Sequence, residues 1–73
     1  MTETIMLNRI KVALAERQKT SKWLAEKLNK SETTVSRWAS NKVQPSIEQL
    51  FEIAQLLNMD AKELLNTTIT STL

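Results

Sequence analysis

The sequence predicts a small all-α fold, a compact bundle of five helices, and three observations support this. Apolar residues recur at spacings of three and four, which is the period of a helix with one buried face. Residues that cap helices precede most of these apolar stretches. Asparagine, which can end a helix in place of glycine, follows several of these stretches. We expect helices near 4–17, 21–28, 32–40, 47–57 and 61–66, joined by short linkers.

The first two predicted helices carry short apolar stripes. In the range 4–17 the stripe consists of Leu7, Ile10, Ala13 and Leu14. In the range 21–28 it consists of Leu24, Ala25 and Leu28. Thr20 and Ser21 precede the second stripe and supply hydroxyls for its first turn. Ala25 is small and central in its helix, so it lets the next helix cross closely.

The third predicted helix, 32–40, has an unusual composition. Ser31 precedes it as a cap, and only Val35 and Trp38 are placed to face a core. Its other early positions are short or hydrogen-bonding residues, namely Glu32, Thr33, Thr34, Ser36 and Arg37. A helix that is merely solvated more often carries long Glu and Lys pairs. This composition favours a helix whose outer face contacts another molecule.

The fourth predicted helix, 47–57, has the longest apolar stripe. The stripe consists of Ile47, Leu50, Phe51, Ile53, Ala54 and Leu57. Ser46 and Gln49 have the spacing of a capping box, in which each side chain bonds the other residue's backbone N–H. Pro45 disfavours helix at Gln44 and so separates this helix from the third. Apolar residues beyond the needs of one small core favour a dimer surface, and these are Phe51, Leu56 and Met59.

Asparagine is expected to replace glycine at the ends of helices. Asn29, Asn41 and Asn58 each follow an apolar stripe, and asparagine is the next best residue for a left-handed terminating position. Asp60 opens the fifth helix, 61–66, with acids in its first turn. We expect the domain to span 1–66. The threonine-rich segment 67–73 is expected to be a flexible tail, or alternatively a short strand formed on dimerisation.

The composition argues against catalysis and against metal binding. Because the chain has no Cys, His or Tyr, it lacks the usual nucleophile–base pairs and zinc ligands. The absence of glycine excludes a glycine-rich phosphate loop. The longest apolar run, 12–15, is too short for a signal peptide or a membrane helix. We expect a cytoplasmic protein that is not an enzyme and has no cofactor.

The net charge of +2 conceals an asymmetry between the two halves of the chain. Residues 1–42 contain nine Lys and Arg against four Asp and Glu, a net of +5. Residues 43–73 contain one Lys against four acids, a net of −3. This division predicts a surface that faces a polyanion. The alternative is the uneven charge that many small soluble domains have.

Capping residues and apolar residues follow one another in a specific order and spacing from Leu7 to Leu65. The residues that form this pattern are Ile10, Ala13, Leu24, Ala25, Leu28, Ser31, Thr34, Val35, Ser36, Arg37, Trp38, Pro45, Ser46, Leu50, Ile53, Ala54, Leu57, Glu63, Leu64 and Leu65. In this arrangement the chain resembles the Cro/C1-type (XRE-like) helix-turn-helix proteins. The resemblance implies a lambda-repressor-like DNA-binding domain. It also implies that helix 32–40 enters the major groove of DNA.

The resemblance implies a set of contact residues. Contacts to base edges would come from Glu32, Thr33, Thr34 and Arg37. Contacts to phosphates would come from Ser21, Lys22, Ser36, Asn41, Lys42 and Ser46. Arg37 suits bidentate recognition of guanine, and Glu32 suits the cytosine amine. Alternatively, Arg37 is an ordinary surface residue and Glu32 a first-turn acid.

The chain departs from the family pattern in three ways. Ser21 stands where the family often has a phosphate-contacting Gln, so a shorter side chain would have to make that contact. Leu14 and Ala39 replace an Arg and a Glu that many members bury as a pair, and losing both partners together strands no charge. Residues other than glycine stand at three frequent glycine positions, namely Gln18, Asn29 and Asn41.

Two functional hypotheses follow. The first is a transcription regulator that binds double-stranded DNA sequence-specifically as a homodimer and therefore associates with the nucleoid. The second is a protein-interaction module on the same fold, such as an antitoxin or anti-repressor. Trp23 either packs over the first helix or lies at an interface, and packing is favoured. Neither hypothesis involves a membrane.

Overall fold

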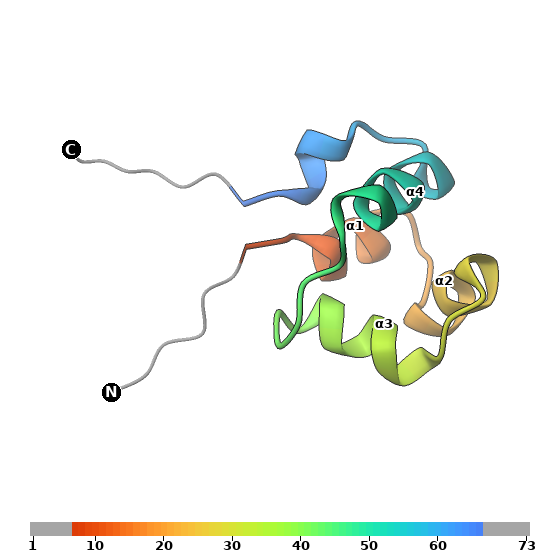
Figure 1. The fold of residues 1–73 in the computed structure, drawn as a ribbon. Helices are drawn as coiled ribbons and strands as arrows, with labels where there is room; N and C mark the ends of the chain where they lie inside the picture. The colour runs from red at the N-terminus through yellow and green to blue at the C-terminus, as the bar shows by residue number, and fades with distance from the viewer. Residues whose placement is uncertain (1–6, 67–73) are drawn as a thin grey trace.

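The computed structural model describes residues 7–66 and contains, within them, four α-helices and one 3-10 helix (Figure 1). In chain order these are α1 (Ile10–Glu16), α2 (Ser21–Leu28), α3 (Glu32–Ala39), α4 (Ile47–Leu57) and η1 (Ala61–Leu64). The prediction of an all-α fold is confirmed. The expected tail, 67–73, lies outside the described residues.

The first and last predicted helices are shorter than expected. Residues 4–6 of the first lie outside the described part of the chain, and residues 7–9 are not helical. Asn8 instead forms an antiparallel bridge with Leu65. The backbone N–H of Arg9 donates to the Leu64 carbonyl at 2.7 Å, and that of Asn66 donates to the Leu7 carbonyl at 3.0 Å. These bonds between the two ends replace helical ones, which is why α1 begins late and η1 is a single 3-10 turn.

Three hydroxyl residues cap the helices that they were predicted to cap. Thr20 Oγ1 accepts from the Trp23 backbone N–H at 3.0 Å at the start of α2. Ser31 Oγ accepts from the Thr34 backbone N–H at 3.1 Å at the start of α3. Ser46 and Gln49 form the predicted capping box of α4, with bonds of 3.1 and 3.0 Å. Each cap satisfies an N–H that the helix itself leaves unpaired.

Left-handed backbone occurs at the three predicted asparagines and at one further residue. Asn29, Asn41 and Asn58 have φ values of 58°, 64° and 57°. Asn29 and Asn58 are the C-caps of α2 and α4, and Asn41 directly follows the C-cap of α3. Gln18 adopts φ of 58° after α1, which sequence reasoning did not predict. Asparagine tolerates this conformation better than most residues, whereas glutamine has no such advantage.

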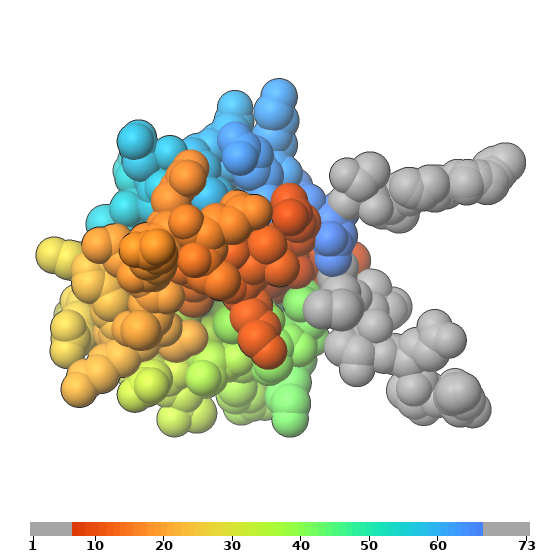
Figure 2. All heavy atoms as spheres, turned by 180° about the vertical axis from the view of Figure 1, so that it is seen from behind, coloured from red at the N-terminus to blue at the C-terminus, as the bar shows by residue number. Residues whose placement is uncertain are grey.

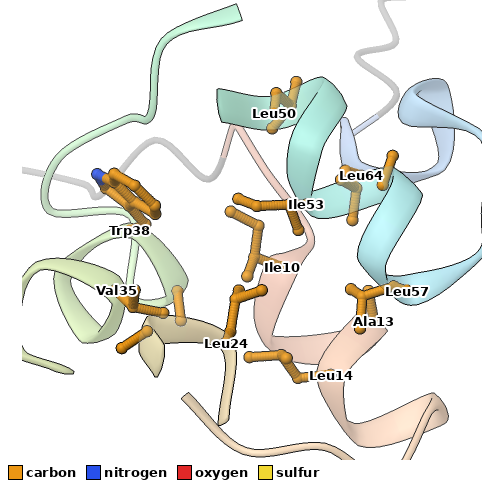
Figure 3. Packing of buried hydrophobic residues seen from close by; sticks show 13 residues of the cluster. Ile10, Ala13, Leu14, Leu24, Val35, Trp38, Leu50, Ile53, Leu57 and Leu64 are labelled. Carbon is orange, nitrogen blue, oxygen red and sulfur yellow. The ribbon is translucent and has the colours of Figure 1, made fainter. Parts of the chain in front are cut away.

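The core lies where α1, α2, α3, α4 and η1 converge (Figure 3). Its fully buried large residues are Ile10, Leu24, Val35, Ile53 and Leu64. Trp38 points into this cluster from α3, as predicted, and is 4% exposed. Trp23 is partly buried against the core, with Lys19 Nζ 4.9 Å from the ring centroid. Leu14 and Ala39 both belong to the core, so the residues that replace the family's buried ion pair are themselves packed.

The helices are arranged so that α3 occupies one edge of the molecule. It packs against α2, in which Ala25 is buried, and it also contacts α1. Figures 1 and 2 view the molecule from opposite sides, and in both α3 lies along the lower edge while α4 and η1 lie at the top. Of the helices within 7–66, none is both long and apolar enough to cross a membrane.

Candidate nucleic-acid interface

Helix α3 has one buried face and one exposed face. Val35, Trp38 and Ala39 are buried in the core. The side chains on the other face are exposed, namely Glu32, Thr33, Ser36 and Arg37. We call these four residues the α3 outer face. Since α3 lies at the edge of the molecule, this face is open along the length of the helix (Figure 2). Of the five polar residues that were expected on the outer side of this helix, only Thr34 is not fully exposed.

Thr34 is partly buried, unlike the other three residues expected to contact bases. Its backbone N–H donates to Ser31 Oγ at 3.1 Å, and its Oγ1 accepts from the same hydroxyl at 2.9 Å. The Thr34 hydroxyl oxygen is therefore engaged in the cap of α3. Glu32, Thr33 and Arg37 have no such engagement of their side chains within the described residues.

The loop that follows α3 returns close to the end of that helix. The backbone N–H groups of Lys42 and Val43 donate to the Arg37 carbonyl at 2.9 and 3.3 Å, and the Ser40 hydroxyl donates to it at 3.3 Å. These bonds satisfy a carbonyl in the last turn of α3 and hold the loop beside it. Lys42, whose side chain is exposed, consequently lies beside the C-terminal end of α3.

The remaining residues expected to contact phosphates differ in accessibility. Lys22 is exposed on the first turn of α2, where Ser21 is half-buried. Ser46 is exposed, and its oxygen accepts the capping bond from Gln49. Ser36 is exposed on α3 itself. Helix α2 packs against α3. Helix N-termini carry partial positive charge and free N–H groups, which suit anions.

Asn41 lies inside the protein, which is a correction to its expected place at a phosphate. It is 7% exposed, and its side chain pairs with the backbone of Asn8. Asn41 Oδ1 accepts from the Asn8 N–H at 3.0 Å, and Asn41 Nδ2 donates to the Asn8 carbonyl at 3.2 Å. The carboxamide thus forms with the Asn8 backbone the two hydrogen bonds that the backbone of a neighbouring strand would form. The Asn41 side chain is therefore not part of the candidate interface.

Asn8 is the centre of a polar network that sequence reasoning missed. Its Nδ2 donates to the Trp38 carbonyl at 2.9 Å and to Gln44 Oε1 at 2.7 Å. Its Oδ1 accepts from the Ile10 N–H at 3.0 Å, at the start of α1. Gln44 Nε2 closes the network by donating to Asn41 Oδ1 at 3.0 Å. We call Asn8, Asn41 and Gln44 the amide network. It fixes the loop that carries Lys42 to the segment that precedes α1.

The charges of the two halves of the chain are separated in space. The four acids of the C-terminal half lie on α4, on η1 or between them, at the side of the molecule away from α3 (Figure 1). Lys22, Arg37 and Lys42 lie on or beside the two helices at the other side. Arg17 does not belong to this group, because its Nε donates to the Leu57 carbonyl at 2.8 Å and so binds the end of α4. A polyanion would meet the α2–α3 side with less repulsion.

A shallow pocket adjoins the α3 outer face. It encloses about 130 Å³ and is lined by Thr34, Arg37, Trp38 and Val43. None of these four residues is a carboxylate. Residues 7–66 also contain no group of His, Cys, Asp and Glu side chains that would hold a metal ion.

Comparisons with known proteins agree with this architecture. No curated protein matches the chain. The crystal structure of a candidate DNA-binding protein from Bacteroides fragilis is similar, with 60% identity, a TM-score of 0.82, and coverage of 82% of this chain and 97% of that one. A helix-turn-helix family model matches residues 10–64, which run from the start of α1 to the end of η1. The chain therefore belongs to the Cro/C1-type helix-turn-helix family.

Proposed function

We propose that this protein is a transcription regulator that binds duplex DNA sequence-specifically, with α3 in the major groove. The observation that carries the proposal is the α3 outer face, a row of exposed hydrogen-bonding side chains on a helix at the edge of the domain. The major groove is wide enough to admit one helix, and its base edges carry a unique pattern of donors and acceptors. Family membership and the similarity to the Bacteroides fragilis protein support the same function.

The chemistry of each side chain gives it a proposed role. Arg37 donates two hydrogen bonds to the O6 and N7 atoms of guanine, and Glu32 accepts from the amino group of cytosine. Thr33 offers a methyl and a hydroxyl to the neighbouring base pair. Lys22 and Lys42 neutralise phosphates on either side of the groove and fix the position of the helix without reading sequence.

The apolar surface of α4 supports a homodimer. Ile47 and Phe51 are one turn apart on this helix and are 68% and 57% exposed. Leu56 is also exposed, whereas Met59 packs partly against the core. We propose that a second copy covers Ile47 and Phe51. Two copies related by a two-fold axis would read half-sites about 34 Å apart, one helical turn of DNA.

The same apolar pair favours a second candidate function, the binding of a different protein. Phe51→Ser separates the two candidates, since a polar residue there weakens any apolar interface. If the pair serves the DNA-binding dimer, Phe51→Ser lowers both the dimer fraction in sedimentation and the affinity for a two-half-site duplex. If the pair serves another protein, the variant changes neither quantity.

The test of DNA binding is a selection of bound duplexes from a random pool, followed by affinity measurements at increasing salt. Each phosphate contact contributes a slope of about −0.9 to the log–log plot of affinity against salt. We expect a recurrent sequence and a slope that indicates several phosphate contacts. A pool without enrichment, together with affinity that does not respond to salt, would exclude the proposal.

A further inference from the structure

The pocket beside the α3 outer face has the lining of a site for a small apolar group. Trp38, only 4% exposed, forms its base, and Val43 forms a rim that is 41% exposed. The Thr34 hydroxyl is engaged by Ser31, so the methyl is the free end of that side chain. Arg37 forms the remaining wall and is the only charged residue in the lining.

The volume and the lining exclude several other occupants. Sites for drug-sized molecules usually enclose about 300–1,000 Å³, well above the 130 Å³ found here. A metal ion would find no carboxylate, thiolate or imidazole among the four lining residues. An anion would meet Arg37 but would have to be desolvated against Trp38 and Val43, at a cost that one exposed cation does not offset.

The position of Arg37 indicates which apolar group would enter. In the major groove the only apolar group on a base edge is the C5 methyl of thymine, or of cytosine when it is methylated. Where the neighbouring base pair contains a guanine, this methyl lies beside the O6 and N7 atoms of that guanine. A side chain that binds guanine while lining an apolar pocket therefore places the pocket next to that methyl.

We propose that Thr34, Trp38 and Val43 form a specificity pocket for the C5 methyl of a pyrimidine adjacent to the guanine bound by Arg37. The inference rests on the proposed function and deepens it by naming a two-base step. The pocket then reads the first base by shape, and Arg37 reads the second by hydrogen bonds. Trp38 thus serves both the core and, through its exposed edge, the readout of DNA.

The test replaces each thymine of the selected duplex, one at a time, by deoxyuridine, which removes only the methyl group. Burial of one methyl is worth ~0.8 kcal/mol, so we expect about a fourfold loss of affinity at the thymine next to the guanine and no loss elsewhere. Val43→Ala should bring the thymine-to-uracil affinity ratio at that position close to one. Val12→Ala is the matched control, because Val12 is similarly exposed, at 44%, but lies on α1. It should keep the fourfold ratio.

A further pair of duplexes identifies the source of the methyl. They carry cytosine or 5-methylcytosine in place of the sensitive thymine. Tighter binding of the methylated duplex supports a pocket that accepts the methyl of either base. Equal binding of the two, with the uracil effect intact, supports a pocket for thymine alone.

Two outcomes would overturn the inference, and they differ in what they say of the proposed function. If every uracil duplex binds within twofold of the parent while salt-dependent binding persists, the pocket reads no methyl but the protein still reads DNA. If no duplex is enriched by the selection, the proposed function fails and the pocket proposal fails with it. An unchanged ratio in Val43→Ala would also overturn the assignment of the pocket.

Discussion

The α3 outer face and the amide network are both built from polar side chains, yet they differ in what satisfies those groups. In the amide network, Asn8 and Asn41 are 3% and 7% exposed. In each of these two side chains, both the oxygen and the nitrogen of the carboxamide form hydrogen bonds with backbone groups. Within residues 7–66 no buried side-chain nitrogen or oxygen lacks a partner. The α3 outer face is exposed, and water satisfies it until a partner displaces the water.

Residue type alone therefore does not mark an interface. Buried polar groups must find partners inside the protein, because leaving one unpaired costs ~1–3 kcal/mol. Exposed polar groups contribute little to stability and are therefore free to serve recognition. Substitutions in the amide network should change the free energy of unfolding, whereas those on the α3 outer face should change binding.

Asn8→Ala should produce the largest loss. It removes the side-chain bonds to the Trp38 carbonyl, Gln44 and the Ile10 N–H, and it leaves buried backbone groups unpaired. We expect the free energy of unfolding to fall by ~3 kcal/mol in urea titrations. Gln55→Ala, an exposed amide on α4, is the control and should change it by less than ~0.5 kcal/mol. Equal effects of the two variants would show that the network does not stabilise the fold.

Asn41→Gly and Asn58→Gly form a matched pair. Both residues have left-handed backbone, which glycine adopts without strain, but only the Asn41 side chain pairs with Asn8. We expect Asn41→Gly to destabilise by ~1–2 kcal/mol and Asn58→Gly to be neutral or slightly stabilising. Thermal unfolding of the two variants gives the difference directly. No difference between them would mean that Asn41 matters only for its backbone conformation.

Gln18→Gly should raise stability. Gln18 is exposed and has φ of 58°, where a residue with a Cβ is strained and gains nothing from its side chain. Relief of that strain should exceed the entropy that glycine adds to the unfolded chain, giving a gain of ~0.5 kcal/mol. A loss of stability in the same urea titration would contradict the left-handed assignment at this position.

Thr33→Ala and Ser36→Ala should have the smallest effect on folding. Both side chains are exposed on α3, and alanine has the higher helix propensity. We expect the free energy of unfolding of either variant to stay within ~0.5 kcal/mol of the parent. Destabilisation by more than ~1 kcal/mol would show that the α3 outer face is part of the fold and is not available for recognition.

Local signals in the sequence were sufficient for much of the fold. The caps at Thr20, Ser31 and Ser46 and the left-handed asparagines depend on residues within a few positions of each other. The two faces of α3 follow from helical periodicity in the same way. These features could be predicted because the physics that creates them acts within one or two helical turns.

Features that depend on distant residues could not be predicted. Asn8 and Asn41 are 33 positions apart, and nothing near either residue indicates that they pair. The bridge between Asn8 and Leu65 delays the start of α1 and ends η1 early, and it too joins residues far apart in the sequence. Asn41 was predicted to contact a phosphate because it follows the third helix. Only the assembled structure reveals that its side chain is buried. The DNA contacts on the α3 outer face stay predictions.

The most direct test of the α3 outer face compares Arg37→Ala with Lys27→Ala on the selected duplex. Both variants remove one exposed positive charge, but Lys27 lies on α2 and has no proposed contact. We expect Arg37→Ala to lose ~1–3 kcal/mol of binding free energy and to relax the preference at one base pair, with unfolding unchanged. Lys27→Ala should bind as the parent does. Equal affinities for the two variants, or a loss in Arg37→Ala that is the same on every sequence, would contradict this prediction.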